Sequence, residues 1–109
     1  MTALPRVCVS VVEPTMDGAE RAAAAAADAG AFCEIRLDAL DSAHELTVES
    51  LGPLCRRLPV LLTWRTRADG GRADVDDAWR LALLAECSAR YGAMCDVEFS
   101  RVDRLAALG

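Results

Sequence analysis

The stretch DGAERAAAAAADAGAFCEIRL at residues 17–37 decides the fold class, because it places a helix directly before a strand. Acidic residues open the alanine run, where they complement the helix dipole, and Gly30 follows as a C-terminal cap. After the glycine, apolar residues alternate with charged ones, as they do in a strand. We therefore predict a helix over 17–29 and a strand over 32–37.

The same alternation of helix and strand repeats along the chain. Strands are predicted at residues 6–12, 32–37, 59–66 and 94–99. Helices are predicted at residues 17–29, 46–58, 75–91 and 101–108. Gly52 and Pro53 are expected to break or kink the second helix. The units repeat about every 26 to 35 residues, the length of a β-α step, so successive strands are expected to lie parallel.

Four such repeats predict an α/β fold of parallel β-α units. This pattern fits either a doubly wound open sheet or part of a barrel, and periodicity alone does not choose between them. The 109 residues fall well below the roughly 250 residues of a closed eight-unit barrel. We expect residues 1–109 to form a single partial domain.

Composition excludes several classes of function. The 53% hydrophobic content predicts a packed core, and the net charge of -5 argues against nucleic acid as a partner. No apolar run reaches the ~18 residues of a membrane span, so we expect a cytoplasmic protein with no membrane partner. The cysteines form no C-x-x-C pair, so we expect no metal site and small buried thiols: Cys8, Cys33, Cys55, Cys87 and Cys95.

The chain has no lysine, since its twelve basic residues are all arginines. An imine with a ketone requires an amine, and here only the α-amino group could supply one. No imine chemistry is therefore expected to originate from these side chains.

The strands carry charges where fully covered parallel strands would be continuously apolar. In Glu34-Ile35-Arg36-Leu37-Asp38 the period of two places the three charged side chains on one face. Polar residues alternate in the same way in the other strands, at Cys8 and Ser10, Thr63 and Arg65, and Asp96 and Glu98. An unpaired buried charge costs several kcal/mol, so these charges must pair or face a ligand and water.

Two interpretations of these charges remain. In the first, they form a buried ion network with Arg36 between Glu34 and Asp38 and with Arg65 bridging to Glu98. In the second, they form a ligand site, because ligands bind beyond the C-terminal ends of parallel strands. Two guanidinium groups beside carboxylates suit a small hydroxylated carboxylate, since arginine binds its oxygens bidentately and glutamate accepts from its hydroxyls.

Four segments together carry a pattern typical of one family. They are Val9-Ser10-Val11, Glu34-Ile35-Arg36-Leu37-Asp38, Thr63-Trp64-Arg65-Thr66 followed by Asp69-Gly70-Gly71, and Asp96-Val97-Glu98-Phe99. In this order and spacing the sequence resembles the type I 3-dehydroquinate dehydratases over almost its full length. The pair E-x-R-x-D and T-[FW]-R-T-x-x-[ED]-G-G is the specific part of the resemblance.

The resemblance implies the first half of a (β/α)8 barrel that dehydrates 3-dehydroquinate to 3-dehydroshikimate in the shikimate pathway, without a metal or organic cofactor. In the family a lysine forms an imine with the substrate ketone, and a histidine acts as general base and acid. By motif, Ser10, Glu34, Arg36 and Arg65 match substrate-binding positions. Asp69 stands where the family usually has glutamate, near the catalytic histidine.

Neither catalytic residue of the family is expected in this chain, because both come from strands later than the fourth. His44 does not replace the base, since it lies at the predicted start of the second helix, where a surface or capping role is expected. We expect the chain alone to be inactive. It is then a truncated dehydratase, one half of a split enzyme, or a non-catalytic half-barrel that binds a quinate-like polyol carboxylate. Open sheet edges predict a homo-oligomer or a complementary C-terminal half-barrel as partner.

Overall fold

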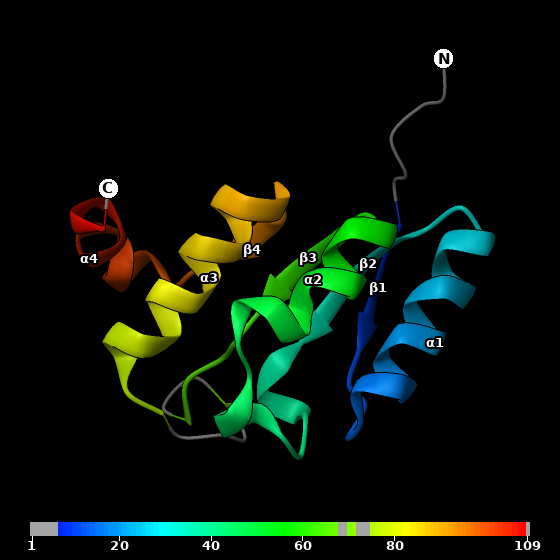
Figure 1. The fold of residues 1–109 in the computed structure, drawn as a ribbon, viewed down its shortest axis with the longest axis horizontal. Helices are drawn as coiled ribbons and strands as arrows, with labels where there is room; N and C mark the ends of the chain where they lie inside the picture. The colour runs from blue at the N-terminus through cyan, green and yellow to red at the C-terminus, as the bar shows by residue number, and fades with distance from the viewer. Residues whose placement is uncertain (1–6, 68–69, 72–74, 109) are drawn as a thin grey trace.

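The computed structural model describes residues 7–67, 70–71 and 75–108, in which strands and helices alternate (Figure 1). The strands are β1 (Cys8–Val11), β2 (Phe32–Arg36), β3 (Val60–Thr63) and β4 (Met94–Asp96). The α-helices are α1 (Met16–Asp28), α2 (Val48–Arg57), α3 (Asp77–Tyr91) and α4 (Val102–Ala107). Short 3-10 turns are η1 (Leu37–Ala39), η2 (Ala43–Glu45) and η4 (Phe99–Arg101). The predicted α/β class is confirmed, with strands shorter than predicted.

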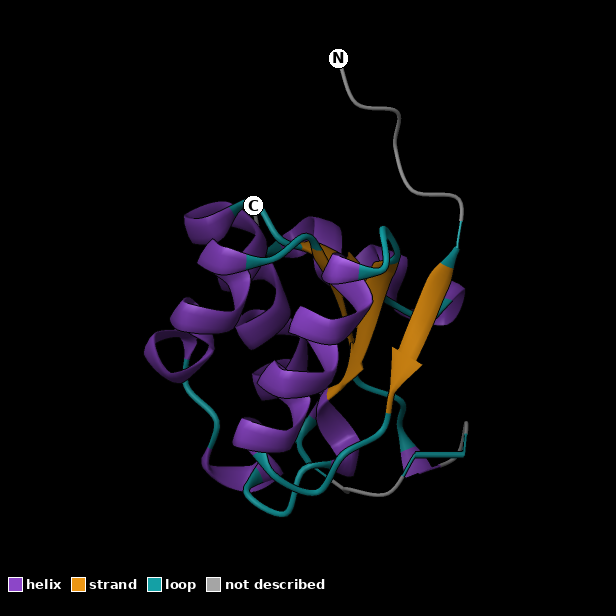
Figure 2. Cartoon of the chain, turned by 90° about the vertical axis from the view of Figure 1, so that its right-hand side faces the viewer, coloured by secondary structure: helices purple, strands orange, loops and turns teal. Residues whose placement is uncertain are grey.

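The order of the strands distinguishes the two architectures that periodicity left open. All four strands pair in parallel, in the order β1-β2-β3-β4. A doubly wound sheet requires a reversal of strand order, whereas sequential order with right-handed crossovers keeps every helix on one face. Figure 2 shows the long helices gathered on one side of the strands. The fold is therefore consistent with part of a (β/α)8 barrel.

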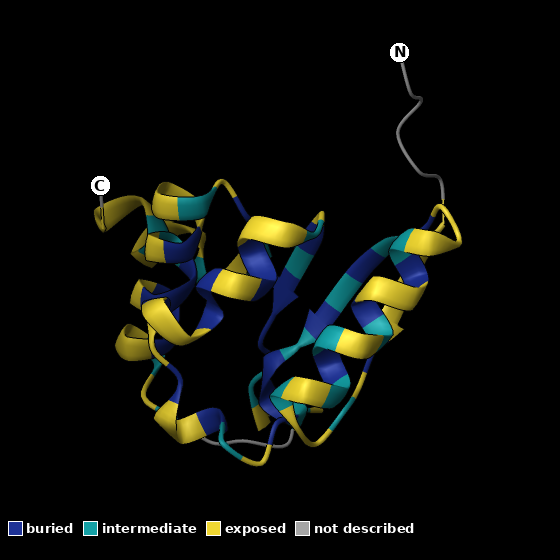
Figure 3. Ribbon diagram, turned by 45° about the vertical axis from the view of Figure 1, so that its right-hand side comes forward, coloured by how far each residue is buried: buried dark blue, intermediate teal, exposed yellow. Residues whose placement is uncertain are grey.

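The core lies between the sheet and the helices that cover it. In β2 and β3, Ile35 and Leu62 point to the helix side and are fully buried. Leu51 and Leu54 of α2 and Leu84 of α3 belong to the same cluster of buried side chains. The helices bury the side that faces the sheet and expose the opposite side (Figure 3). One face of the sheet is thus fully used for packing, which leaves the other for the polar side chains.

Helix α2 continues through Gly52 and Pro53, so these residues do not break it, and the alternative of a kink stays a prediction. The hydroxyl of Tyr91, on α3, donates to the carbonyl oxygen of Val48 at 3.1 Å. A Cβ atom at Gly52 would lie 2.9 Å from that hydroxyl oxygen, so the glycine permits the close approach of the two helices. Packing against α3 therefore holds a helix that its local sequence disfavours.

Apolar side chains are exposed at both edges of the sheet. Val7 and Val9 are exposed at the β1 edge, and Met94 is exposed on β4. Cys8 is exposed and Cys95 is half-buried, which corrects the expectation that all five thiols are buried. Cys8 lies on β1, which has a neighbouring strand on one side only. Beyond the opposite edge, an open groove of about 720 Å³ runs between α3, β4 and α4 with a mainly apolar lining.

Candidate functional site

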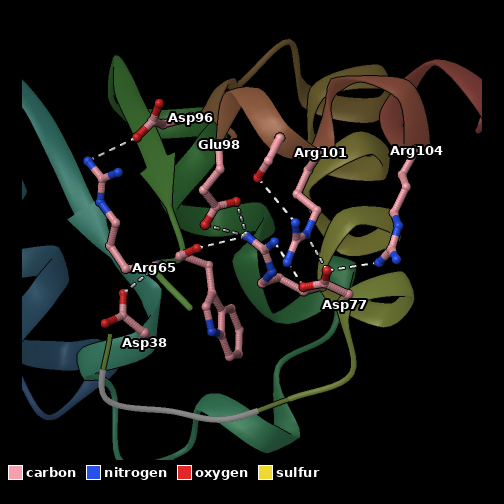
Figure 4. A network of polar contacts seen from close by, with 10 residues as sticks. Asp38, Arg65, Asp77, Asp96, Glu98, Arg101 and Arg104 are labelled. Atoms are coloured by element: carbon pink, nitrogen blue, oxygen red, sulfur yellow. Dashed lines mark hydrogen bonds and ion pairs between the residues drawn. The ribbon is translucent and has the colours of Figure 1, made fainter. Parts of the chain in front are cut away.

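Polar side chains from the four strands gather toward the C-terminal edge of the sheet. Ser10 Oγ donates to Glu34 Oε1 at 2.7 Å, and Thr63 Oγ1 donates to Glu34 Oε2 at 2.8 Å. Beyond the end of β3, Arg65 Nη2 lies 3.2 Å from Asp96 Oδ2 (Figure 4). Each carboxylate oxygen of Glu34 has a second lone pair, so the side chain is held in place and can still accept further hydrogen bonds.

The surroundings of Glu34 favour its ionised form. Partial burial raises the pKa of this carboxyl group, but hydrogen bonds from Ser10 and Thr63 and the positive charges of Arg65 and Arg36 outweigh it, so the pKa lies below its ordinary value of 4.5. At neutral pH the side chain is a fixed hydrogen-bond acceptor. It is not poised to act as a general acid.

The lowered pKa of Glu34 predicts an acid-sensitive contribution to stability. Because the folded pKa lies below the unfolded one, ionised Glu34 stabilises the fold above the unfolded pKa, and this contribution disappears as the pH falls through the folded pKa. We expect the free energy of unfolding to fall more steeply below about pH 4.5 in the native chain than in Glu34→Gln. Urea unfolding at a series of pH values measures both slopes.

The control for this titration is Glu86→Gln, which removes an exposed carboxylate on α3. This variant should follow the pH dependence of the native chain. Equal slopes for the native chain and Glu34→Gln would contradict the assignment.

Arg36 and Asp38 form a second pair beside Glu34. Arg36 Nε and Nη2 donate to the two carboxylate oxygens of Asp38 at 3.0 and 2.8 Å. The hydrogen bonds to Asp38 raise the pKa of Arg36 above its usual value. The expectation that Glu34, Arg36 and Asp38 alternate along one strand needs a correction. Strand β2 ends at Arg36, and Asp38 lies on η1, where its side chain is fully buried.

The ion network proposed from periodicity is also corrected. Arg65 pairs with Asp96 and not with Glu98. Glu98 lies 3.0 Å from a guanidinium nitrogen of Arg80, on α3. The reason is that β4 ends at Asp96, so the strand alternation that would place Asp96 and Glu98 on one face stops before Glu98.

Arg80 is a buried ion-pairing residue that the sequence patterns did not single out. Its side chain is 1% exposed, and Nη1 donates to the carbonyl oxygen of Trp64 at 2.9 Å. A signal was available, because Arg80 stands one and two turns before the buried Leu84 and Cys87. A charged residue on the apolar stripe of a helix indicates a buried partner.

Asp77, in the first turn of α3, pairs with the two arginines that follow β4, Arg101 and Arg104. It accepts a hydrogen bond from Arg101, and Arg104 Nη1 donates to its Oδ2 at 2.9 Å (Figure 4). Arg80 Nη2 lies 3.1 Å from the other oxygen. Desolvation raises the pKa of Asp77, but the opposite effect of the hydrogen bonds from Arg101 and Arg80 is larger. The pKa of Asp77 therefore lies below its usual value. These pairs fasten α4 to the start of α3.

The two glycines of the motif shape the chain after Arg65. Gly70 has a φ of 89°, which favours glycine, and the N–H of Gly71 donates to the carbonyl oxygen of Thr66 at 2.7 Å. A Cβ atom at Gly71 would collide with the carbonyl group of Arg65, so the loop folds back closely on this residue. Asp69 lies outside the described residues, and its orienting role stays a prediction.

The remaining candidate features give no further site. His44 is exposed on η2, the turn before α2, in agreement with the predicted surface role. Within residues 7–67, 70–71 and 75–108, no group of three or more His, Cys, Asp or Glu side chains could hold a metal ion. None of the helices in this described part is long and apolar enough to cross a membrane.

The chain matches a known protein family. A family model described as type I 3-dehydroquinase matches residues 7–107. The matched range contains the four strands and the polar side chains at their C-terminal ends. We call these side chains the polar cluster: Ser10, Glu34, Arg36, Thr63, Arg65 and Asp96. A search of curated proteins found no match.

Proposed function

This chain belongs to the type I 3-dehydroquinase family, and from that premise we propose that its polar cluster binds 3-dehydroquinate, the substrate of that family. The cluster then forms the substrate-binding part of a site that dehydrates 3-dehydroquinate to 3-dehydroshikimate. The proposal is carried by Glu34, which Ser10 and Thr63 hold beside two guanidinium groups at the C-terminal ends of parallel strands.

Ser10, Glu34, Arg36 and Arg65 are the proposed substrate contacts. Glu34 offers its remaining lone pairs to substrate hydroxyls. The side chains of Arg65 and Asp96 are 40% and 38% exposed, so their ion pair is weak and a substrate carboxylate can displace Asp96 from the guanidinium group. Arg36 is held more firmly, since both its hydrogen bonds end on a fully buried carboxylate.

The dehydration step needs groups that these residues do not provide. The 109 residues contain no lysine, and their single histidine is the exposed His44. We propose that residues 1–109 form part of one barrel domain, whose imine-forming lysine and general-base histidine come from outside these residues. A later part of the same polypeptide or a second polypeptide could contribute them. The apolar groove beside β4 supports such a partner.

The proposed division of roles predicts that the purified 109-residue chain is inactive. Without an amine in the site, 3-dehydroquinate cannot form an imine there, so we expect no turnover and no adduct after borohydride reduction. Turnover is followed by the ultraviolet absorbance of the conjugated product, and the adduct by mass spectrometry. Measurable turnover by this chain alone would overturn the division.

Mixing this chain with a polypeptide that carries the later strands of the family, histidine and lysine included, should restore turnover. The borohydride adduct should then appear on the added polypeptide. The alternative function is that of a non-catalytic half-barrel that forms a homo-oligomer and binds a quinate-like polyol carboxylate. The absence of lysine favours this alternative. If this chain binds the ligand but mixing it with a folded polypeptide of the later strands restores no turnover, the result would favour the non-catalytic alternative.

A further inference from the structure

The peptide group between Trp64 and Arg65 is held at both ends by a charged side chain. Its carbonyl oxygen accepts a hydrogen bond from Arg80 Nη1 at 2.9 Å, and its N–H donates to Asp38 Oδ1 at 3.2 Å. The described chain has no cis peptide bond, so the two bonds leave this group in opposite directions. Asp38 and Arg80 are 2% and 1% exposed. Two buried charges of opposite sign therefore hold one peptide plane.

This peptide lies just beyond the reach of the sheet. The last residue pairs of β3 are Arg36 with Thr63 and Thr63 with Asp96. After Thr63 the neighbouring strands no longer pair with the chain, because β2 has turned into η1 and β4 has ended. The two charged side chains thus take the place of the ladder hydrogen bonds. Charge-assisted hydrogen bonds are about twice as strong as neutral ones.

Each of the two charged residues is itself held by further partners. Asp38 binds Arg36 through both carboxylate oxygens. Arg80 lies 3.0 Å from an oxygen of Glu98 and 3.1 Å from an oxygen of Asp77. Neither side chain can turn away without losing an ion pair. Asp38 thus links the side chain of Arg36 to the backbone of Arg65, and Figure 4 shows Asp38 next to Arg65.

We propose that Asp38 and Arg80 are positioning residues for ligand binding. They fix the peptide from which the side chain of Arg65 projects, and Asp38 also fixes where this side chain lies relative to that of Arg36. Neither residue needs to touch the ligand. This inference rests on the proposed binding of a quinate-like carboxylate by Arg65.

Hydrogen exchange at the backbone amide of Arg65 tests the clamp without any ligand. Arg80→Lys keeps the charge, but a single ammonium group cannot reach the Trp64 carbonyl oxygen and both carboxylates. We expect the Arg65 amide to exchange roughly tenfold faster or more in Arg80→Lys, the scale of a lost hydrogen bond to a charged group. The amide of Leu62, in the middle of β3, should keep its rate.

Arg90→Lys is the matched control, since Arg90 is an exposed arginine on the same helix, paired with Glu49. It should leave both exchange rates unchanged. An unchanged Arg65 rate in Arg80→Lys, or an equal acceleration at Arg65 and Leu62, would overturn the clamp. If Arg80→Lys does not fold, Asp38→Asn tests the opposite end of the peptide with the same expected result.

Titration with quinate and with its uncharged methyl ester then tests the effect on the ligand. Arg80→Lys should weaken quinate binding about tenfold and leave binding of the ester nearly unchanged, because only the carboxylate uses Arg65. Equal weakening of both ligands would overturn the positioning role. If the native chain binds no quinate, the proposed function fails, whereas the exchange rates still decide whether the clamp exists.

Discussion

Arg65→Ala is expected to remove the measurable heat of quinate binding at ligand concentrations that saturate the native chain. The variant deletes a guanidinium group that the substrate carboxylate would engage and leaves that carboxylate without its charged partner. Losing one side of such a charge pair costs about 2–5 kcal/mol, which is roughly thirtyfold or more in affinity. Isothermal titration calorimetry of the native chain and the variant measures this loss.

The control for charge is Arg57→Ala, because Arg57 is exposed in the last turn of α2, before β3 begins, and so lies at the opposite end of the strands. It removes one positive charge and should leave quinate affinity unchanged. Native-like affinity in Arg65→Ala would exclude Arg65 as a ligand contact. A flat titration of the folded native chain would remove the binding proposal altogether.

Trp64→Ala is expected to be among the most destabilising single substitutions in the chain. Trp64 is 1% exposed, the largest of the fully buried side chains, and its ring meets that of Trp79 edge to face at 5.6 Å. Truncation of a fully buried tryptophan leaves a large cavity and costs about 3–5 kcal/mol. Urea unfolding followed by circular dichroism should show this loss as a large fall in the denaturation midpoint.

Trp79→Ala is the matched control, because it removes the same ring contact from a side chain that is 36% exposed. We expect a loss of only about 1–2 kcal/mol, since the edge-to-face contact and a partly buried surface are all that disappear. Equal losses in the two variants would contradict the view that Trp64 anchors the core at the end of β3.

The sequence alone predicted the elements whose signals are local. The helix expected at 17–29 is observed as Met16–Asp28, and the strand expected at 32–37 as Phe32–Arg36. The alanine run, the acidic first turn and Gly30, with a φ of 79°, all act within a few residues of each other. The alternation that places Ser10 and Glu34 each on the polar side of its own strand followed from the same kind of reasoning, because it is a local property. Their pairing across the two strands comes from the structure.

Only the tertiary structure decided which segments became neighbours. The sequential strand order, which is consistent with part of a barrel and differs from that of a doubly wound sheet, depends on how the crossovers pack. Asp38 lies on η1, after the end of β2, and accepts a hydrogen bond from the backbone N–H of Arg65. Arg80, on α3, forms an ion pair with Glu98. Periodicity predicts on which face of a strand a side chain lies, but only within the strand. It carries no information on where the strand ends or on which distant charge then comes within reach, because pairing of buried charges is set by three-dimensional packing.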